Sequence, residues 1–304
     1  MTIDPRFDFE QPLEQTDALR DPVLIAAFRG WNDAGDAASF AAEHLGRTWN
    51  ARRIGTIDPE DFFDFQAVRP TVHLDDGLTR RITWPSNDFF IARGTEGPRD
   101  ALVLVGTEPN LKWRTFSNIV VQIADHFGVE LVITLGALLA DVPHTRPVPV
   151  TGTAADDDLV QRLGLRRSRY EGPTGIVGVL HDAFRRAGIA SASLWAAVPH
   201  YLAVTPNPKA ALALVESAVG LVGAPADIDS LARAAVEYEG RMDEIIAADE
   251  DASTYVRVLE ERADERDEQE SLEELDPSSL PSGDALAAEL ERFLRQRSEG
   301  DDKI

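Results

Sequence analysis

The residues of this sequence that could do chemistry lie mostly in polar loops that follow short apolar runs. The candidates are Arg29, Trp31, Asn32, Asp33, Glu108, Asn110, Trp113, His144, Arg146, Glu171, Thr174, Gly175 and His200. A histidine and an arginine, joined by a carboxylate such as Glu171 or Asp141, could transfer a proton and hold a phosphate. The same polar side chains could instead only satisfy loop backbone, so the catalytic residues are unknown and both interpretations stay open.

The first of these loops, RGWNDAGDAAS, raises the question of a structural or a binding role. Asp33 or Asp36 could cap the helix that follows, and Gly30 and Gly35 allow backbone conformations that other residues resist. That explanation leaves out Trp31, whose large ring at a loop tip needs a lid, a subunit or a ligand to cover it. A subunit is the simplest cover.

Two helix starts carry unusual residues. In GTEPNLKWRTF, Lys112 and Arg114 oppose the helix dipole, so a salt bridge to a nearby acidic group is expected. In YEGPTGIVG, Thr174 is placed to be the N-cap of a helix that begins after Gly175. The glycine spacing there matches neither the dinucleotide fingerprint nor the P-loop, although an anion could rest on the helix N–H groups.

Several chemistries are excluded by residue type. The chain has no cysteine, so disulfides, thiolate nucleophiles and cysteine-bound metals are ruled out. No G-x-S-x-G motif is present, and no two of the six histidines have a metal-binding spacing. We therefore expect no metal and no cofactor.

The charge of the chain limits its partners. The formal net charge is −23 and the isoelectric point is about 4.6, so phosphate backbones and anionic lipid surfaces would repel it. The N-terminal residues lack a basic and apolar signal pattern, and no apolar stretch of about 18 residues occurs. We expect a soluble cytoplasmic protein that binds neither nucleic acid nor a membrane.

The elements that position the loops follow an alternating strand and helix pattern. Apolar runs predict buried parallel strands at residues 23–28, 101–106, 131–137 and 192–198. Apolar residues at three- and four-residue spacing predict helices at 35–49, 113–127, 175–187 and 208–222. An Asp-Gly pair predicts a β-hairpin insertion within 71–93. These elements indicate an α/β fold with a mostly parallel sheet flanked by helices on both faces.

The last quarter of the chain differs in composition. From residue 227 onward, 25 acidic residues face 9 basic ones, a net charge of −16. We therefore predict an α/β core at 1–226 and an acidic helical C-terminal region at 227–304. Its apolar spacing predicts two antiparallel helices joined near Glu250 and a last helix at about 284–297. A solvated helix face explains the charge better than a partner-binding arm.

Taken in order, five segments resemble the PAC2 (proteasome assembly chaperone 2) family, and in particular its actinobacterial branch. The segments are AFRGWNDAGDAAS, GTEPNLKWRTF, LGALLADVPHTRPVPVTGTA, YEGPTGIVGVLHDAF and SLWAAVPHYL. The resemblance implies a phosphorylase/hydrolase-like fold and self-association, with a trimer as one expected form. It also implies a relation to proteasome assembly, although the end Asp302-Lys303-Ile304 lacks the hydrophobic-Tyr-any tripeptide of such chaperones.

Two functional hypotheses follow. The first is a non-enzymatic, homo-oligomeric interaction protein that presents Trp31 and Trp113, with proteasome subunits as candidate partners. The alternative is a protein that binds a nucleoside or a phosphorylated ligand, or a hydrolase/phosphorylase-like enzyme. It would use a pocket at the carboxyl ends of the strands, with Arg29, Arg146 and the helix start at Gly175.

Overall fold

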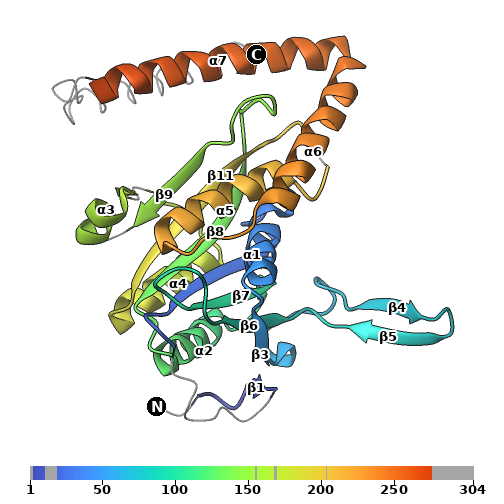
Figure 1. Cartoon of the computed structure of the whole chain (residues 1–304). Helices are drawn as coiled ribbons and strands as arrows, with labels where there is room; N and C mark the ends of the chain where they lie inside the picture. The colour runs from blue at the N-terminus through green and yellow to red at the C-terminus, as the bar shows by residue number, and fades with distance from the viewer. Residues whose placement is uncertain (1–2, 11–18, 155, 168–169, 203, 276–304) are drawn as a thin grey trace, which may run out of the picture. The chain divides into compact units, whose positions relative to one another are not determined.

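The computed structural model describes residues 3–10, 19–154, 156–167, 170–202 and 204–275. The chain divides into two compact units, Met1–Ser253 and Thr254–Ile304. The first unit contains the α/β body (Figure 1). In the second, the structure describes the part of α7 (Glu250–Leu275) that follows Ser253.

A nine-stranded mixed sheet forms the centre of the first unit, in the order β1-β3-β6-β7-β2-β8-β11-β9-β10. The strands are β1 (Phe7–Phe9), β2 (Val23–Arg29), β3 (Arg52–Ile57), β6 (Asn87–Ala92), β7 (Ala101–Thr107), β8 (Leu131–Ala140), β9 (Val150–Ala154), β10 (Arg166–Arg167) and β11 (Ala190–Pro199). The central strands β7, β2, β8 and β11 are parallel. Because parallel strands end at the same edge, the loops that follow them meet there.

The four predicted strands are the central strands of this sheet, so the largely parallel α/β core is confirmed. Their residues are buried on both faces because helices cover the sheet on each side. The strand β8 runs three residues past its predicted end and β11 runs one, and they stay paired as far as Ala140 and Pro199.

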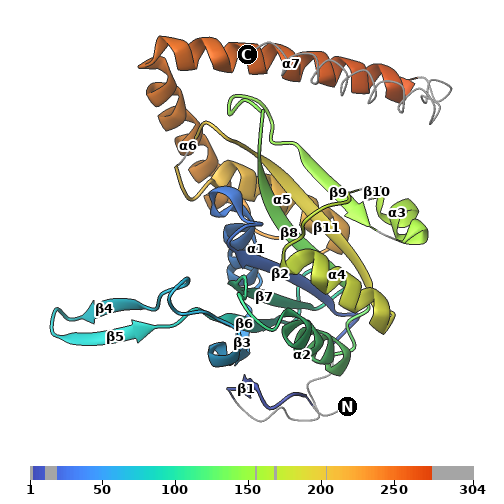
Figure 2. The same cartoon turned by 180° about the vertical axis from the view of Figure 1, so that it is seen from behind.

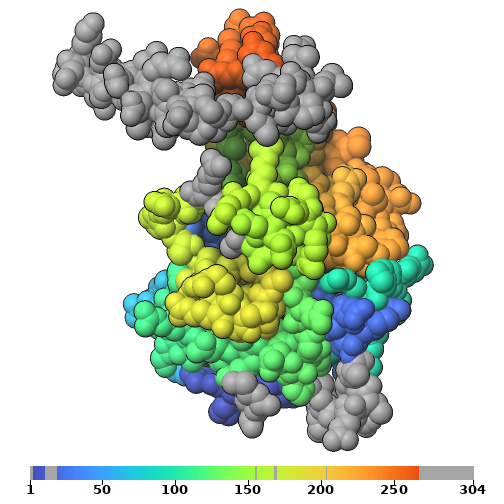
Figure 3. All heavy atoms as spheres, turned by 90° about the vertical axis from the view of Figure 1, so that its left-hand side faces the viewer, coloured from blue at the N-terminus to red at the C-terminus, as the bar shows by residue number. Residues whose placement is uncertain are grey.

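Helices cover both faces of the sheet (Figures 1 and 2). The helices of the first unit before α7 are η1 (Ala34–Asp36), α1 (Ala37–Thr48), η2 (Pro59–Asp61), α2 (Trp113–His126), α3 (Asp157–Leu163), α4 (Ile176–Ala187), α5 (Pro208–Val222) and α6 (Asp229–Ala247). Apolar side chains of α1 and α5 pack with one face of the central strands, and those of α2 and α4 with the other. Figure 3 views the first unit from the side where α3 and α4 lie.

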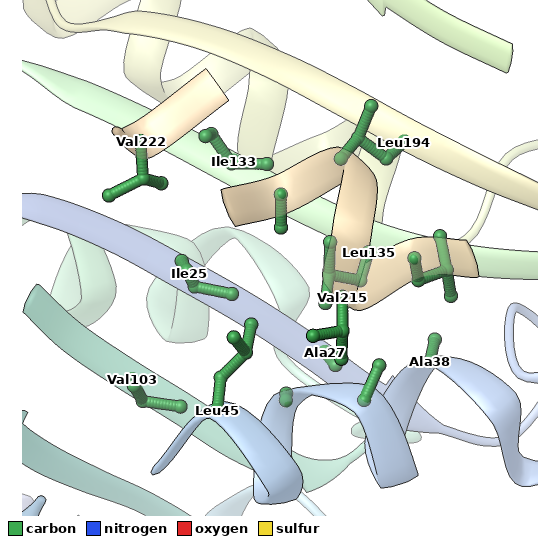
Figure 4. Packing of buried hydrophobic residues seen from close by; sticks show 14 of the residues in the cluster. Ile25, Ala27, Ala38, Leu45, Val103, Ile133, Leu135, Leu194, Val215 and Val222 are labelled. Carbon is green, nitrogen blue, oxygen red and sulfur yellow. The ribbon is translucent and has the colours of Figure 1, made fainter. Parts of the chain in front are cut away.

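Alternate side chains of each central strand enter opposite cores. Ile25 and Ile133 join the core under α1 and α5, where Leu45 and Val215 meet them (Figure 4). Leu24, which is next to Ile25 in β2, enters the core under α2 and α4. Since the apolar side chains of both cores are buried against one another, the sheet gives the loops at its edge a rigid support.

The predicted hairpin is confirmed as a separate two-stranded sheet, formed by β4 (Thr71–Asp75) and β5 (Thr79–Thr83). Asp76 and Gly77 have φ values of 53° and 73° at its turn, which the Asp-Gly pair allows. Figures 1 and 2 show the hairpin extending away from the nine-stranded sheet. We call β4, β5 and their turn the arm.

In its described part the acidic region forms helices, as predicted, with a break at Ala248 and Asp249 between α6 and α7. The antiparallel arrangement of the two helices stays a prediction. Along α6, the apolar stripe Leu231, Tyr238 and Met242 is buried, but Ile245 is about half exposed and Ile246 packs in its place. The helix predicted at 284–297 lies outside the described residues. The domain boundary near residue 226 stays a prediction.

Short elements at the sheet edges were not predicted. The strand β3 has no regular apolar alternation, and its Gly55 lies against β1, where a Cβ atom would approach the Asp8 carbonyl oxygen to 2.5 Å. The strands β1, β9 and β10 have two to five residues each. Such short segments carry too little periodic pattern for a sequence-based assignment.

Candidate functional site

The loops at the carboxyl ends of β2 and β7 meet the start of α4, and a carboxylate joins them. Glu108 Oε1 accepts a hydrogen bond from the Ile176 backbone N–H at 2.7 Å and from Asn32 Nδ2 at 3.3 Å. A Cβ atom on Gly175 would lie 2.4 Å from Asn32 Nδ2 and 2.6 Å from Glu108 Oε1. Three of the predicted site regions therefore come together, and a side chain at residue 175 would displace Asn32 or Glu108.

The prediction that Thr174 is the N-cap of α4 is wrong. Gly175 occupies that position without a side-chain hydrogen bond, and Thr174 is exposed. The Glu108 carboxylate, delivered from another loop, satisfies the first N–H group of the helix instead. A full negative charge is favourable at a helix N-terminus, and it is provided here by a residue 68 positions away in the sequence.

Asp33 caps the helix that follows it, as its structural interpretation predicted. Its Oδ1 accepts hydrogen bonds from the backbone N–H groups of Ala38 at 2.7 Å and Ser39 at 3.2 Å, and Oδ2 accepts one from Ser39 Oγ at 2.5 Å. Burial raises the pKa of Asp33, while these hydrogen bonds act in the opposite direction. Asp36, the other predicted cap, makes no such bond.

The remaining polar groups of the first loop are also engaged. The Asn32 carbonyl oxygen accepts a hydrogen bond from the Ala137 N–H at 2.8 Å, which fixes the loop to β8. Arg29 pairs with Glu43 of α1. The side chain of Trp31, in contrast, is 67% exposed. The loop is therefore held rigidly by its neighbours and presents one uncovered aromatic ring.

Asn110 and Trp113 form hydrogen bonds that stabilise the loop after β7. Asn110 Oδ1 accepts a hydrogen bond from the Asp64 N–H at 3.1 Å, and Trp113 Nε1 donates to the Pro109 carbonyl oxygen. Lys112 forms the expected salt bridge, at 2.6 Å to Asp61. These contacts fix local backbone.

A second cluster lies beyond β8 and β11. His144 is buried, with Nδ1 at 2.8 Å from Tyr201 Oη and Nε2 at 3.1 Å from Asp243 on α6. Burial lowers the pKa of His144, and Asp243 partly offsets this. Lys209 donates to the His144 carbonyl oxygen and pairs with Glu239. The cluster joins α5 and α6 to the sheet.

The proposed proton-transfer set is only partly assembled. His200 is exposed, with Nδ1 at 3.2 Å from Asp141, one of the two predicted carboxylates. Arg146 is partly buried beside Thr145, and Glu171 is exposed in the segment before α4. His144, whose ring nitrogens already face Tyr201 and Asp243, is sequestered from solvent.

Two hollows in the described part of the chain do not match a substrate pocket at the strand ends. The one bordered by His144, Asn207 and Lys209 measures about 10 Å³, which is room for a single water. A wider and open hollow of about 370 Å³ lies between α1 and α6, beside Phe40 and Leu231. Among the described residues, no group of three or more His, Asp or Glu could hold a metal ion.

Comparison with known proteins identifies the family. The PAC2 family profile matches residues 27–246, well over half of the chain. The chain therefore belongs to the PAC2 family. No curated protein matched it. No helix of the described part is long and apolar enough to cross a membrane.

Solved structures agree with this assignment. A PAC2 family protein from Streptomyces avermitilis is 48% identical, with 78% of this chain and 100% of that chain covered and a TM-score of 0.72. A proteasome-assembly chaperone homologue from Mycobacterium tuberculosis is 44% identical, with 77% and 99% covered and a TM-score of 0.70. An archaeal proteasome activator from Pyrococcus furiosus is 18% identical, covers 79% and 97%, and shares the fold with a TM-score of 0.63.

Proposed function

We propose that this PAC2-family protein is a non-enzymatic, homo-oligomeric interaction protein. The observation that carries the proposal is the contrast within one loop. Asn32 and Asp33 are buried and hydrogen-bonded within the chain, while the neighbouring Trp31 is 67% exposed. Large exposed aromatic side chains on a rigid support are typical of protein interfaces, where they contribute much of the binding energy.

Proteasome subunits are the proposed partners beyond the chain itself. Support comes from the Mycobacterium tuberculosis relative, which is described as a proteasome-assembly chaperone homologue and is 44% identical over its whole length. The acidic character of the chain, with a net charge of −23, favours a partner that offers basic or apolar surface.

The enzymatic alternative has less support. A nucleoside or phosphorylated ligand needs a pocket of several hundred Å³ with free polar groups. The hollow at the strand ends is about 10 Å³, and Glu108 and Asp33 already accept hydrogen bonds from helix starts. The phosphorylase/hydrolase-like assignment of the fold rests on the family resemblance and remains a prediction, as does the trimer.

Co-purification tests the proposal. Tagged wild-type protein, expressed in its native host, should recover proteasome α-subunits under mild salt, and the variant Trp31→Ser should recover at least about tenfold less. Val236→Ser is the matched control, because Val236 on α6 is 74% exposed and leaves the loop intact. Equal recovery with Trp31→Ser, or no recovery with the wild type, would refute the assignment of partner or surface.

A further inference from the structure

The arm has one apolar and one polar face, and both are open to solvent. The register pairs Val72 with Ile82 and Leu74 with Arg80, so these four side chains share a face. Val72, Leu74 and Ile82 are each 53% to 60% exposed. The other face is polar, formed by Thr71, Thr83 and the cross-strand pair of His73 and Arg81.

An isolated pair of strands is marginally stable in water and usually needs further strands or a packed face. The arm forms its own two-stranded sheet, and no other strand of the described chain pairs with it. Leu78 at its turn is 89% exposed. An apolar face that the rest of the described chain leaves open, on a structure of marginal stability, indicates that another molecule covers it.

The charge of the arm indicates which molecule that is. Two copies of a chain with a net charge of −23 repel each other unless they meet where negative charge is sparse. The arm contains two arginines and two aspartates, so it is neutral in a chain whose net charge is −23. Arg80, on the apolar face, offers a cation to the carboxylates of a second copy.

We propose that the apolar face of the arm docks on a second copy of this chain. Val72, Leu74 and Ile82 supply the buried apolar contact, and Arg80 supplies the charge complementarity. This inference rests on the self-association in the proposed function and assigns a surface to it. The arm is a contact separate from the Trp31 loop, because it forms a sheet of its own that extends away from the strands carrying that loop (Figures 1 and 2).

Sedimentation equilibrium of the full chain tests the proposal. The variant Val72→Thr/Leu74→Thr/Ile82→Thr keeps β-branched residues in the strands but makes the apolar face polar. Self-association should weaken about 100-fold or more. The control His73→Thr/Thr83→Ser changes the opposite face of the same strands and should associate as the wild type does.

The outcomes separate this inference from the proposed function. Wild-type association that survives the triple substitution overturns the docking of the arm and leaves self-association standing. A monomeric wild type at all concentrations overturns both. If the variant fails to fold, amide hydrogen exchange of the wild type decides: residues 71–83 should be protected in the oligomer and exchange faster on dilution. If the amide exchange of residues 71–83 is the same before and after dissociation, the inference is overturned.

Discussion

The polar side chains of the strand-end loops and the apolar side chains of the arm lie in opposite environments. In the loops, Asp33 and Asn32 are buried and bonded to backbone or side-chain groups. In the arm, Leu74 and Ile82 are more than half exposed. Buried polar groups with partners hold a fold together, whereas exposed apolar groups are available to another molecule. Asp33 and Asn32 therefore stabilise the fold, whereas Leu74 and Ile82 belong to the surface for which we propose association.

The largest loss of stability is expected from Asp33→Ala. The substitution removes the cap of α1 and leaves buried N–H donors without an acceptor, so the free energy of unfolding should fall by about 3 kcal/mol. Urea titration followed by circular dichroism measures it. Asp36→Ala is the control, because Asp36 makes no capping hydrogen bond, and it should cost about 1 kcal/mol or less through its left-handed backbone. Equal losses would show that Asp33 is not a structural cap.

A comparable loss is expected on acidification, because of a buried histidine. His181 on α4 lies 2.9 Å from Thr134 Oγ1 and 2.8 Å from Ser191 Oγ, and burial lowers its pKa to about 4 from 6.5. Between these values the unfolded chain binds more protons than the folded one. Stability should therefore rise with pH across this window, and up to about 3 kcal/mol is lost as the pH falls from 6.5 to 4.

The variant His181→Gln tests this linkage, since glutamine keeps hydrogen-bonding groups but does not titrate in that range. Between pH 6.5 and 4 this variant should lose less stability than the wild type does. The difference between the two losses should be up to about 3 kcal/mol. His126→Gln, at an exposed histidine, should follow the wild-type curve. If the free energy of unfolding of His181→Gln depends on pH as steeply as that of the wild type, the burial of the His181 ring is contradicted.

A smaller effect is expected from Glu108→Ala. It removes the acceptor for the Ile176 N–H and for Asn32 Nδ2, so the free energy of unfolding should fall by about 2 kcal/mol. Glu216→Ala, at an exposed glutamate of α5, should change it by less than about 0.5 kcal/mol. If the Glu108→Ala protein is as stable as the wild type, the Glu108 carboxylate is not needed for the fold and is available for a binding role.

The sequence was sufficient for the parts of the fold that follow a regular pattern. The buried strands β2 and β7 are continuous apolar runs, and α5 has the bounds that its spacing predicted. The Asp-Gly pair located the arm because that turn needs two residues with positive φ. Local periodicity and turn chemistry were the signals in each case.

The site depended on contacts between distant residues, which a single sequence does not reveal. Glu108 caps α4 from 68 positions away, so the nearby Thr174 was the natural but wrong choice. Asp243 of α6 approaches His144 across 99 positions, with no local signal. The apolar face of the arm was visible as a two-residue alternation, but its exposure depends on how the arm extends from the sheet.

We propose that exposed apolar side chains of this protein join copies of the chain. The most direct test of this proposal is the mass of the full chain by sedimentation equilibrium, for the wild type and for the triple arm variant combined with Trp31→Ser. We predict a wild-type mass that is a multiple of 33.3 kDa and a folded variant at 33.3 kDa. A wild type that remains at 33.3 kDa over the whole concentration range, or a variant with the wild-type mass, would contradict the account.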